Sequence, residues 1–491
     1  MAWNEDRAIA RIKEHIKRAP SVDANLTLAR VRADAATARS EGRFPNTRAI
    51  LVEGAQLYGQ LVDFDDLVVE QGKGETEASH KRVLDFLNTH YQVWDSIVDG
   101  DDALRVDFHG PRLHAVVVYP IKDPREQILR AMALAAKLGE AAARVGQAYG
   151  FSSRIRFGID QGRCLAMTTG RSHDTDTLFL GSPANHAAKL ASSGQESGIF
   201  LMPNAQQIVT QVPSQSGIPS FRARQDLIDL ARRQYPFTSV DAAANRVIAS
   251  ATNRAKFGFR RATPPLSKTK FSELSPSNTV RMGMASLFAD IDGYTAFVDN
   301  AIRQGPEAIK TAVVGIHVIR EELNDVLKAD CEGKRVRFIG DCIHGLMTKG
   351  TVATDDDAGA VLDACMCAAA MKSSFDLCCE IVPGLQDLDL AIGIDYGVVP
   401  LTRIGRPGEE SIRCAAGKAV IESERAQQQI ENGGTRLGEG AMNVASHRVR
   451  QHFGSTRRIP EYDDAANLLG APVSQVTTII SQQPSARSHV S

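Results

Sequence analysis

The chain has 491 residues, a formal net charge of −1 and eight cysteines without a C-x-x-C pair. Because an ordinary domain holds ~100 to 200 residues, we expect two or three domains, and the balanced charge gives no sign of a nucleic-acid or membrane surface. No apolar run reaches the ~18 residues that span a bilayer, and the N-terminus lacks an apolar signal segment, so the sequence predicts a soluble, cytoplasmic protein with reduced thiols.

The N-terminal part of the chain is expected to hold an arm and a first module. Residues 1–45 are polar and helical in pattern, and we expect them to form an arm that packs on the first module. The first module is assigned to residues 46–213. An alanine-rich pattern that begins at Asp123 predicts a long helix within it.

A linker and a second module complete the chain. Residues 214–276 combine a short helical pattern from Asp226 with a stretch rich in Pro and Ser, which is typical of a boundary between domains. The second module is assigned to 277–480, where apolar residues at helical spacing predict a helix from Pro306. We expect the tail, 481–491, to be disordered.

The two modules repeat one another at a nearly constant offset. ASLFADIDGYTAFV from Ala285 aligns with AQLYGQLVDFDDLV from Ala55, and VRFIGDCIHGLM from Val336 aligns with VDFHGPRLHAVV from Val106, both at an offset of 230 residues. LAIGIDYGVVPLTRIG aligns with IRFGIDQGRCLAMTTG, and AAGKAVIESERA with FLGSPANHAAKL, at offsets of 235 and 236. Each module therefore reads as βαββαββα, an α+β sheet with helices on one face.

In the second module, two apolar strands end in an aspartate. Asp290 lies in SLFADIDGYTAFV, and Asp341 follows 51 positions later in VRFIGDCIHGLM. Carboxylates at two strand ends can hold divalent cations against a polyphosphate, which predicts an enzyme that acts on a nucleotide. Asp beside Gly is also common in tight turns that bind nothing. Two such carboxylates separated by one helical segment favour the metal site.

Both segments resemble those of the class III nucleotidyl cyclases, in which an FADI-G-[FY]-T strand end and an IGD hairpin each supply one metal-binding Asp. The resemblance implies an α+β fold of two tandem ferredoxin-like cyclase domains that form a pseudo-heterodimer. It implies two divalent cations, Mn²⁺ or Mg²⁺, on Asp290 and Asp341, with the Ile291 carbonyl as a further ligand. The turn after the strand would offer backbone N–H groups to the triphosphate of the substrate. Its residues are Asp292, Gly293, Tyr294 and Thr295.

The first module has lost these carboxylates. Gln60 stands at the position of Asp290, and Pro111 stands at the position of Asp341. Proline has no donor atom and glutamine has no charge, so neither can hold a hard divalent cation as a carboxylate does. We therefore predict that the first module binds no catalytic metal.

The helix that completes such a site shows the opposite loss. In class III cyclases, the Asn and Arg of a V-N-x-A-x-R helix stabilise the reaction over the metals of the partner domain. The first module carries Asn185 and Lys189 at these positions, whereas the second carries Ile421 and Arg425. The resemblance implies one working site, in which Asn185 orients the ribose and Lys189 balances charge on the α-phosphate. The sequence leaves open whether the modules meet within one chain or across a homodimer.

The positions that read the base in purine cyclases hold Asp107 and Leu178 here, so the purine-reading residues are absent. An ionised carboxylate only accepts hydrogen bonds, so Asp107 suits the N4 amine of cytosine. Uracil has two carbonyl acceptors and would prefer a basic side chain. Arg337 of the second module is basic, but we expect it to face the mirror site, in which Gln60 and Pro111 oppose Ile421 and Arg425. CTP is therefore expected ahead of UTP.

The lost purine residues and the DIDGYT and FIGDC segments resemble the Pycsar pyrimidine cyclases of bacterial anti-phage defence. The resemblance implies a metal-dependent enzyme that converts CTP, or less readily UTP, to the 3′,5′-cyclic monophosphate and pyrophosphate. An effector would be linked to it only through the cyclic nucleotide, with no nucleic-acid or membrane partner. Two alternatives stay open: an adenylate or guanylate cyclase with an unusual base pocket, and a catalytically silent nucleotide-binding sensor.

Overall fold

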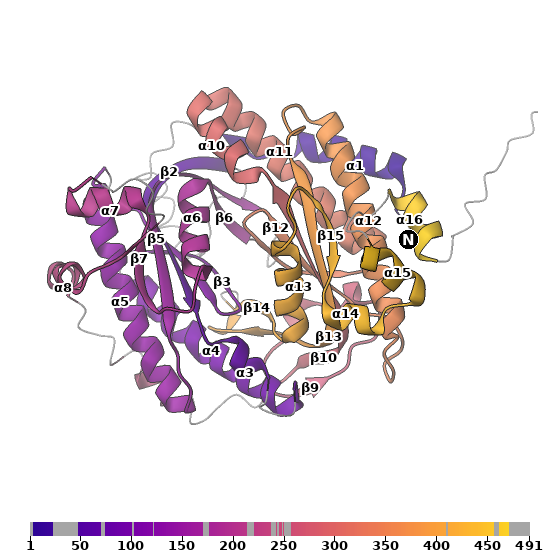
Figure 1. Ribbon diagram of the computed structural model, residues 1–491, viewed down its shortest axis with the longest axis horizontal. Coiled ribbons are helices and arrows are strands. Elements are labelled where there is room, and N and C mark those ends of the chain that lie inside the picture. Colours follow the sequence, from indigo (N-terminus) through magenta and orange to yellow (C-terminus); the bar gives the residue numbers. More distant parts are fainter. Residues whose placement is uncertain are drawn as a thin grey trace, which may run out of the picture.

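Two modules of similar topology lie side by side in the computed structural model of the protein (Figure 1). The first is coloured indigo to magenta in Figure 1 and the second orange to yellow. The structure describes residues 3–22, 48–69, 74–100, 103–120, 122–169, 176–213, 220–236, 242, 245–247, 249, 257–408, 411–455 and 461–470. The tail predicted over 481–491 lies outside the described residues.

The first module is built on a sheet with the strand order β3-β4-β2-β5-β7-β8, to which β6 is added through β5. It follows the predicted βαββαββα order and continues with two further strands and two further helices. Its elements are β2 (Arg48–Leu61), α3 (Asp65–Val68), α4 (Glu77–Gly100), β3 (Leu104–His109), β4 (Arg112–Val117), α5 (Pro124–Tyr149), β5 (Ile155–Thr169), β6 (Asp176–Leu180), α6 (Ser182–Ser192), β7 (Gly198–Leu201), α7 (Pro203–Thr210), β8 (Phe221–Arg222) and α8 (Gln225–Gln234).

The second module repeats this plan on a sheet with the order β11-β12-β10-β13-β14, to which β15 and β9 are added. Its elements are β9 (Phe259–Arg260), β10 (Thr279–Asp292), α10 (Tyr294–Gln304), α11 (Pro306–Asp325), a π-helical turn (Val326–Asp330), β11 (Lys334–Ile339), β12 (Cys342–Met347), α12 (Asp357–Ile381), β13 (Asp389–Ile404), β14 (Ile412–Ala415), α13 (Lys418–Gln428), β15 (Gly434–Leu437), α14 (Glu439–Val444), α15 (His447–Ser455) and α16 (Tyr462–Leu469). The predicted α+β fold class, with two tandem cyclase-like domains, is confirmed.

Local sequence signals explain the long helix predicted from Asp123. The Asp123 carboxylate accepts a hydrogen bond from the Glu126 N–H at 3.0 Å, and Pro124 occupies the first turn. Gly150 ends the helix in a left-handed conformation with φ 67°. An acidic N-cap, an early proline and a terminal glycine are the expected boundaries of a helix. The helix that results, α5, packs its alanine-rich face into the core of the first module.

Each module carries a two-residue hairpin turn at the same place. Gly110 and Pro111 join β3 to β4, and Gly340 and Asp341 join β11 to β12. Both glycines have positive φ, 49° and 61°, a conformation that most other residues avoid. The residue after each glycine is therefore held in the same position in both modules.

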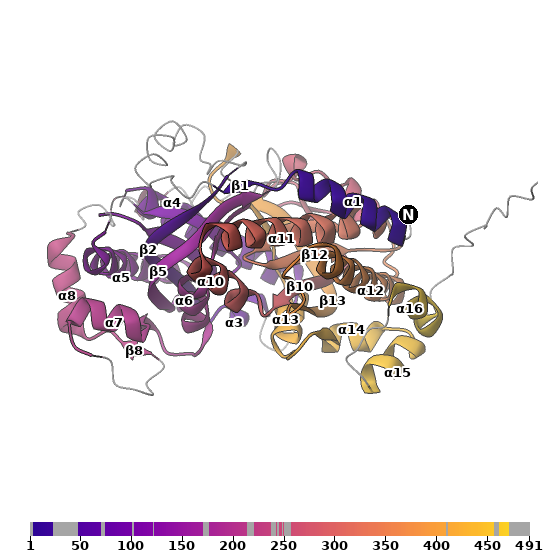
Figure 2. The same cartoon turned by 90° about the horizontal axis from the view of Figure 1, so that it is seen from above.

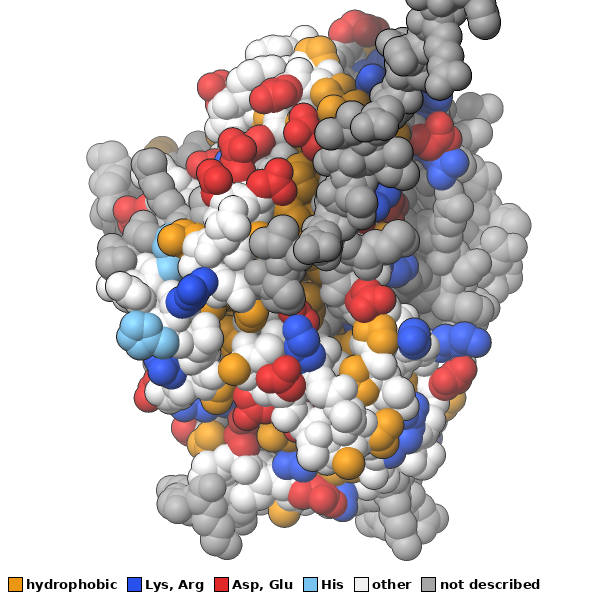
Figure 3. Space-filling view, turned by 90° about the vertical axis from the view of Figure 1, so that its right-hand side faces the viewer, with side chains coloured by type: hydrophobic (Ala, Val, Ile, Leu, Met, Phe, Trp, Pro, Cys, Tyr) orange, Lys and Arg blue, Asp and Glu red, His pale blue; other side chains and the backbone are white. Residues whose placement is uncertain are grey.

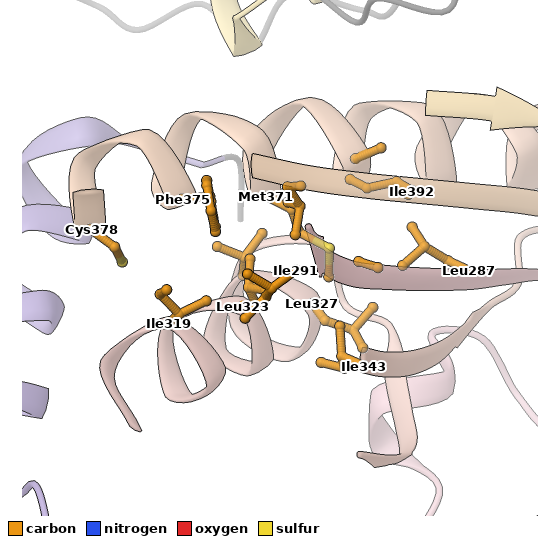
Figure 4. Packing of buried hydrophobic residues seen from close by; sticks show 14 of the residues in the cluster. Leu287, Ile291, Ile319, Leu323, Leu327, Ile343, Met371, Phe375, Cys378 and Ile392 are labelled. Atoms are coloured by element: carbon orange, nitrogen blue, oxygen red, sulfur yellow. The ribbon is translucent and has the colours of Figure 1, made fainter. Parts of the chain in front are cut away.

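An apolar core fixes which side chains of β10 face the site. Figure 4 shows Ile291 among Ile319 and Leu323 of α11 and Phe375 of α12. Because successive residues of a strand face opposite sides of the sheet, the neighbours Asp290 and Asp292 project away from this core. The apolar pattern of β10 thus decides the direction in which its carboxylates point.

The helix of the N-terminal arm packs on the second module, whereas the arm was predicted to pack on the first. Its short strand β1 (Ser21–Val22) pairs with β2 of the first module. Its helix α1 (Glu5–Lys17) runs beside α11 and α12 in Figure 2. Arg11 donates to both Glu322 and Asp330 at distances of 2.6 to 3.1 Å, and Arg7 also pairs with Asp330. These two acids are almost fully buried, so they need a cationic partner. Charge complementarity therefore places the arm there.

Charged side chains, helices and cysteines describe the surface and the redox character of the protein. Figure 3 shows one face on which acidic side chains gather in the upper part and basic side chains are interspersed below. Among the described helices, none has the length and apolar character of a transmembrane span. All eight cysteines are unpaired, and six of them are buried, as predicted.

Candidate active site

Asp290 and Asp341 lie at neighbouring positions on one edge of the second sheet. Asp290 is the third residue from the end of β10, and Asp341 belongs to the turn between β11 and β12. β10 pairs with β12, with Ala289 opposite Ile343, so the strand end and the turn meet. The structure thus brings the two predicted metal-binding carboxylates together.

Both carboxyl groups have raised pKa values. Burial is the largest cause at Asp290, where the charge of Asp292 adds to it and the pKa rises to about 6. Burial is also the largest cause at Asp341, whose pKa is well above its ordinary value because Asp290 repels it, although the Arg320 guanidinium opposes the effect. Crowded, partly buried carboxylates favour a bound cation, since a cation removes their mutual repulsion.

The donor set fits a divalent metal that shares its ligands with a substrate. Among the described residues, no group of three or more His, Cys, Asp or Glu is placed to hold a metal alone. Mg²⁺ is commonly bound by one or two carboxylates, with water and substrate phosphates as the other ligands. Asp290 and Asp341 fit that pattern. A contribution from Ile291 would have to come from its carbonyl, because its side chain is buried in the core.

The turn after β10 opens a helix without a capping side chain. Gly293 is left-handed with φ 82°, and α10 begins at Tyr294 with no side-chain hydrogen bond to its first N–H groups. Such N–H groups attract anions, so the predicted phosphate turn has a suitable backbone. Its side chains serve other purposes. The Asp292 carboxylate accepts from the Gly433 N–H at 2.8 Å, and the Tyr294 ring is buried.

Helix α6 of the first module reaches across to α10 of the second. Asn185 Nδ2 donates to Thr295 Oγ1 at 2.5 Å. One turn earlier, the Ser182 N–H donates to Asp299 Oδ1 at 2.9 Å, and the Ser182 hydroxyl donates to the other oxygen of that carboxylate. Residues three or four apart share one face of a helix. The two helices are therefore joined at two points along facing sides.

Lys189 lies on the same helix, and its charge reaches the carboxylate pair. The side chain is exposed, and its positive charge opposes the rise in the pKa of Asp290. Asn185, Lys189 and Asp290 therefore lie around one site that both modules form. The structure answers the question that the sequence left open, because the modules pair within one chain.

The mirror site is closed by an internal cation. Arg112 Nε donates to Gln60 Oε1 at 3.0 Å, and Arg112 Nη1 donates to Glu424 of α13. Arg425, the counterpart of Lys189, pairs with Asp65. A guanidinium thus lies beside the positions that correspond to the metal-binding carboxylates, and Pro111 supplies no donor to the turn.

The base position Asp107 is already engaged inside the protein. Arg337 Nη1 donates to both carboxylate oxygens of Asp107, at 2.7 and 2.9 Å, and to the Phe108 carbonyl. Arg337 and Asp107 occupy equivalent positions in the two modules and meet at the module interface. Arg337, which was expected to face the mirror site, thus contacts the base position of the predicted working site. The carboxylate that was expected to select cytosine is paired, which removes the physical basis for ranking CTP first.

Arginines surround the second base position. Leu178 is buried in the apolar core and offers no polar group to a base. Two residues before it on β6, the Asp176 carboxylate accepts from Arg413 and lies 3.6 Å from Arg335. The buried cations of this interface are Arg320, Arg335, Arg337 and Arg413.

Several residues of the site carry no motif that sequence reasoning could use. Asp299 anchors α6, and Gln427 Nε2 donates to Asp290 Oδ2 at 3.3 Å, but both lie in ordinary helical segments. Glu424 likewise acquires its role only through Arg112. Arg320 could have been noticed in the sequence, because it is a charged residue on the apolar face of the helix predicted from Pro306.

A family model matches most of the first module. Residues 57–225 match the model described as the adenylate and guanylate cyclase catalytic domain. The matched range is the half of the chain that lacks the two metal-binding carboxylates. The match therefore reflects the fold of that module and not its metal-binding residues.

Two relatives are similar over nearly the whole chain. A uridylate cyclase from a Rhizobium species is 38% identical over 493 residues, covering 92% of this chain and 92% of the relative. A uridylate cyclase from Pseudomonas aeruginosa is 35% identical over 492 residues, covering 95% of this chain and 91% of the relative. A crystal structure of a class III adenylyl cyclase-like ATP-binding protein from Pseudomonas aeruginosa is 33% identical, with a TM-score of 0.85, and covers 96% of this chain and 100% of that one.

Proposed function

This chain belongs to the class III nucleotidyl cyclases, and we propose that it is a pyrimidine nucleotide cyclase that converts UTP to 3′,5′-cyclic UMP and pyrophosphate. One observation carries the proposal. The Asp290 and Asp341 carboxylates lie together at one sheet edge of the second module, and the first module brings Asn185 to the adjoining turn and the charge of Lys189 to Asp290, within one chain. The reaction needs a positioned nucleotide and neutralised phosphate charge more than covalent catalysis.

Each part of the site has a role in this reaction. Two divalent cations, Mg²⁺ or Mn²⁺, held by Asp290 and Asp341 would lower the pKa of the ribose 3′-hydroxyl and neutralise the triphosphate. The uncapped start of α10 offers N–H donors to phosphate oxygens. The Asn185 amide is held near that turn, where it can orient the ribose. Lys189 places a positive charge where negative charge gathers on the α-phosphate.

UTP is the better candidate for the substrate than the CTP expected from the sequence. The preference for CTP rested on a free Asp107 carboxylate, which Arg337 already engages through two contacts. Among the buried guanidinium groups of this interface, Arg320 keeps N–H donors without a partner among the described residues, and such donors suit the two carbonyl groups of uracil better than the amine of cytosine. The two relatives described above, which are named uridylate cyclases, support the same choice.

Incubation of the purified chain with each of the four nucleoside triphosphates and Mn²⁺ tests the proposal. We expect cyclic UMP to be the main product, identified by chromatography and mass spectrometry. Product from CTP alone would reverse the choice of base and leave the cyclase assignment intact. Product from ATP alone would favour the class named in the related ATP-binding structure.

The biological role of the product is a separate part of the proposal. We propose that the cyclic nucleotide acts as a second messenger in anti-phage defence and reaches its effector only by diffusion. Cells that carry the chain and its neighbouring genes should resist phage, and the Asp290→Ala and Asp341→Ala variants should lose resistance. If both variants kept resistance, a catalytically silent nucleotide sensor would be the better description.

A further inference from the structure

Arg320 is a buried arginine whose hydrogen bonds are incomplete. It lies on α11 and is 0% exposed. Its Nη1 donates to the Gly340 carbonyl at 2.6 Å, and its guanidinium carbon lies 3.8 Å from the centre of the Phe338 ring. Its Nε and Nη2 have no hydrogen-bond partner among the described residues. A buried donor without an acceptor costs free energy, so such groups call for an explanation.

The surroundings of Arg320 connect it to the site. Gly340 directly precedes Asp341, and the backbone N–H of Phe338 donates to Asp176 at 3.3 Å. The Tyr294 hydroxyl, at the start of the phosphate turn, is also buried without a partner among the described residues. Arg320 therefore contacts the hairpin that carries Asp341, and that hairpin contacts β6, the strand that carries the base position Leu178.

The first module shows that the fold itself does not require an arginine here. At the offset of 230 residues, the position of Arg320 corresponds to His90 on α4. His90 is also fully buried. Its Nε2 is hydrogen-bonded to Ser153 Oγ at 3.0 Å, its Nδ1 has no partner among the described residues, and burial lowers its pKa to about 3, which keeps it neutral. A cation with free donors occurs at this position only in the module that has the metal-binding carboxylates.

The substrate brings three kinds of acceptor to such a site. Phosphate oxygens are matched by the metals and the start of α10, and the ribose is matched by Asn185. The carbonyl oxygens of the base still have no assigned donor, because the base positions Asp107 and Leu178 provide no free N–H or O–H group. We propose that Arg320 is a specificity-determining residue that donates from Nε and Nη2 to a carbonyl oxygen of uracil. This inference rests on the proposed function, because it assigns the base contact of the same site.

Arg320 variants test the inference through base selectivity, which a purely structural role would not change. In Arg320→Gln, kcat/KM for UTP should fall by roughly 10- to 100-fold, the size of one lost charge-assisted hydrogen bond. The glutamine oxygen can accept from the N4 amine of cytosine, so kcat/KM for CTP should fall less or rise. The ratio of UTP to CTP turnover should therefore drop at least about tenfold.

Two further variants serve as controls. Arg320→Lys keeps the charge but loses the planar fork, so the UTP-to-CTP ratio should fall by roughly threefold only. Arg335→Gln removes a neighbouring cation that lies 4.5 Å from the same Phe338 ring, and it should leave the ratio unchanged even if stability falls. If Arg320→Gln does not fold, as judged by circular dichroism, the Lys variant alone carries the test.

The outcomes separate this inference from the proposed function. A wild-type chain that does not cyclise UTP would overturn the proposed substrate before any variant is made. If the wild-type chain uses UTP but both Arg320 variants keep its UTP-to-CTP ratio, only the role of Arg320 is wrong. An equal drop of the UTP-to-CTP ratio in Arg335→Gln would also overturn the role of Arg320, because the effect would then come from any buried arginine of this interface.

Discussion

The two modules place different charges at equivalent positions, and the difference shows how one site became catalytic and the other closed. In the first module, Arg112 lies between Gln60 and Glu424 and supplies a cation from the protein itself. The second module has the neutral Cys342 at the position of Arg112, next to Asp290 and Asp341. At the second site, Lys189 and Arg320 oppose the negative charge in part, and the divalent cations proposed above would balance the rest. One fold thus supports a closed interface on one side and, on the other, a carboxylate pair that we propose binds metal.

Removing a metal-binding carboxylate should have the largest effect. We expect Asp341→Ala to lower cyclic nucleotide production by on the order of 10³-fold or more, because the cations would lose a ligand. The matched change in the first module, Pro111→Ala, should leave turnover within about twofold. Product measured by mass spectrometry after a fixed time checks both. Similar losses in the two variants would show that the mirror site also contributes to turnover.

The crossing helix should show the next largest asymmetry. Asn185→Ala should lower kcat by roughly 10² to 10³-fold, the usual result of removing one preorganised donor. Arg425→Ala breaks the surface pairs with Asp65 and Glu422 and should change kcat little. Steady-state kinetics on purified variants provide the measurement. Comparable losses from both changes would mean two working sites and would contradict the single-site scheme.

The contact that anchors α6 should have a smaller effect. Asp299→Ala removes the acceptor for the Ser182 N–H and hydroxyl, so we expect kcat to fall about tenfold, with KM changed less, because Asn185 loses its fixed position. Glu75 accepts from the Lys418 N–H at 2.7 Å at the start of α13, the equivalent helix. Glu75→Ala should therefore cost stability but little turnover. If Glu75→Ala lowered kcat and Asp299→Ala did not, α13 and not α6 would be the helix that completes the working site.

A change at the carboxylate pair that lowers activity should raise the stability of the metal-free protein. In a metal-free buffer, Asp290→Asn removes the charge that repels Asp341, so the free energy of unfolding should rise by about 1 kcal/mol and Tm by roughly 2 to 4 °C. Mn²⁺ should raise the Tm of the wild-type chain more than that of the variant. Differential scanning fluorimetry with and without Mn²⁺ checks both statements. A lower Tm for the metal-free variant would show that the pair is not under repulsion.

Restoring carboxylates to the mirror site should have the smallest effect. In an inactive Asp290→Ala chain, the added changes Gln60→Asp and Pro111→Asp should recover no turnover. Arg112 and Glu424 would still fill the space, and the facing helix has Ile421 in place of the Asn. A nucleotide cyclase assay on the triple variant checks this. Recovery above about 1% of wild-type turnover would show that sequence loss alone, and not closure, had silenced the mirror site.

Local patterns were sufficient for much of the fold and for the metal-binding half of the site. The α5 helix followed from its cap residues and alanine content, and the repeat followed from alignment of the chain with itself. Asp290 and Asp341 could be found because each ends an apolar strand next to a glycine turn. The position of the N-terminal arm could not be found in this way, because Arg11 meets its acids Glu322 and Asp330 more than 300 residues away.

By itself, the sequence determined the two modules, the single pair of strand-end carboxylates and the Asn185 helix, because these depend on residue types at fixed spacing along a strand or a helix. Only the tertiary structure decided that the modules pair within one chain and that Arg337 engages Asp107, since residue 337 and residue 107 meet only across the module interface. A side chain's chemistry can be read from its identity, but its availability depends on its partner. For this reason the sequence could mark Asp107 as a base position, but only the fold revealed that the carboxylate was already paired.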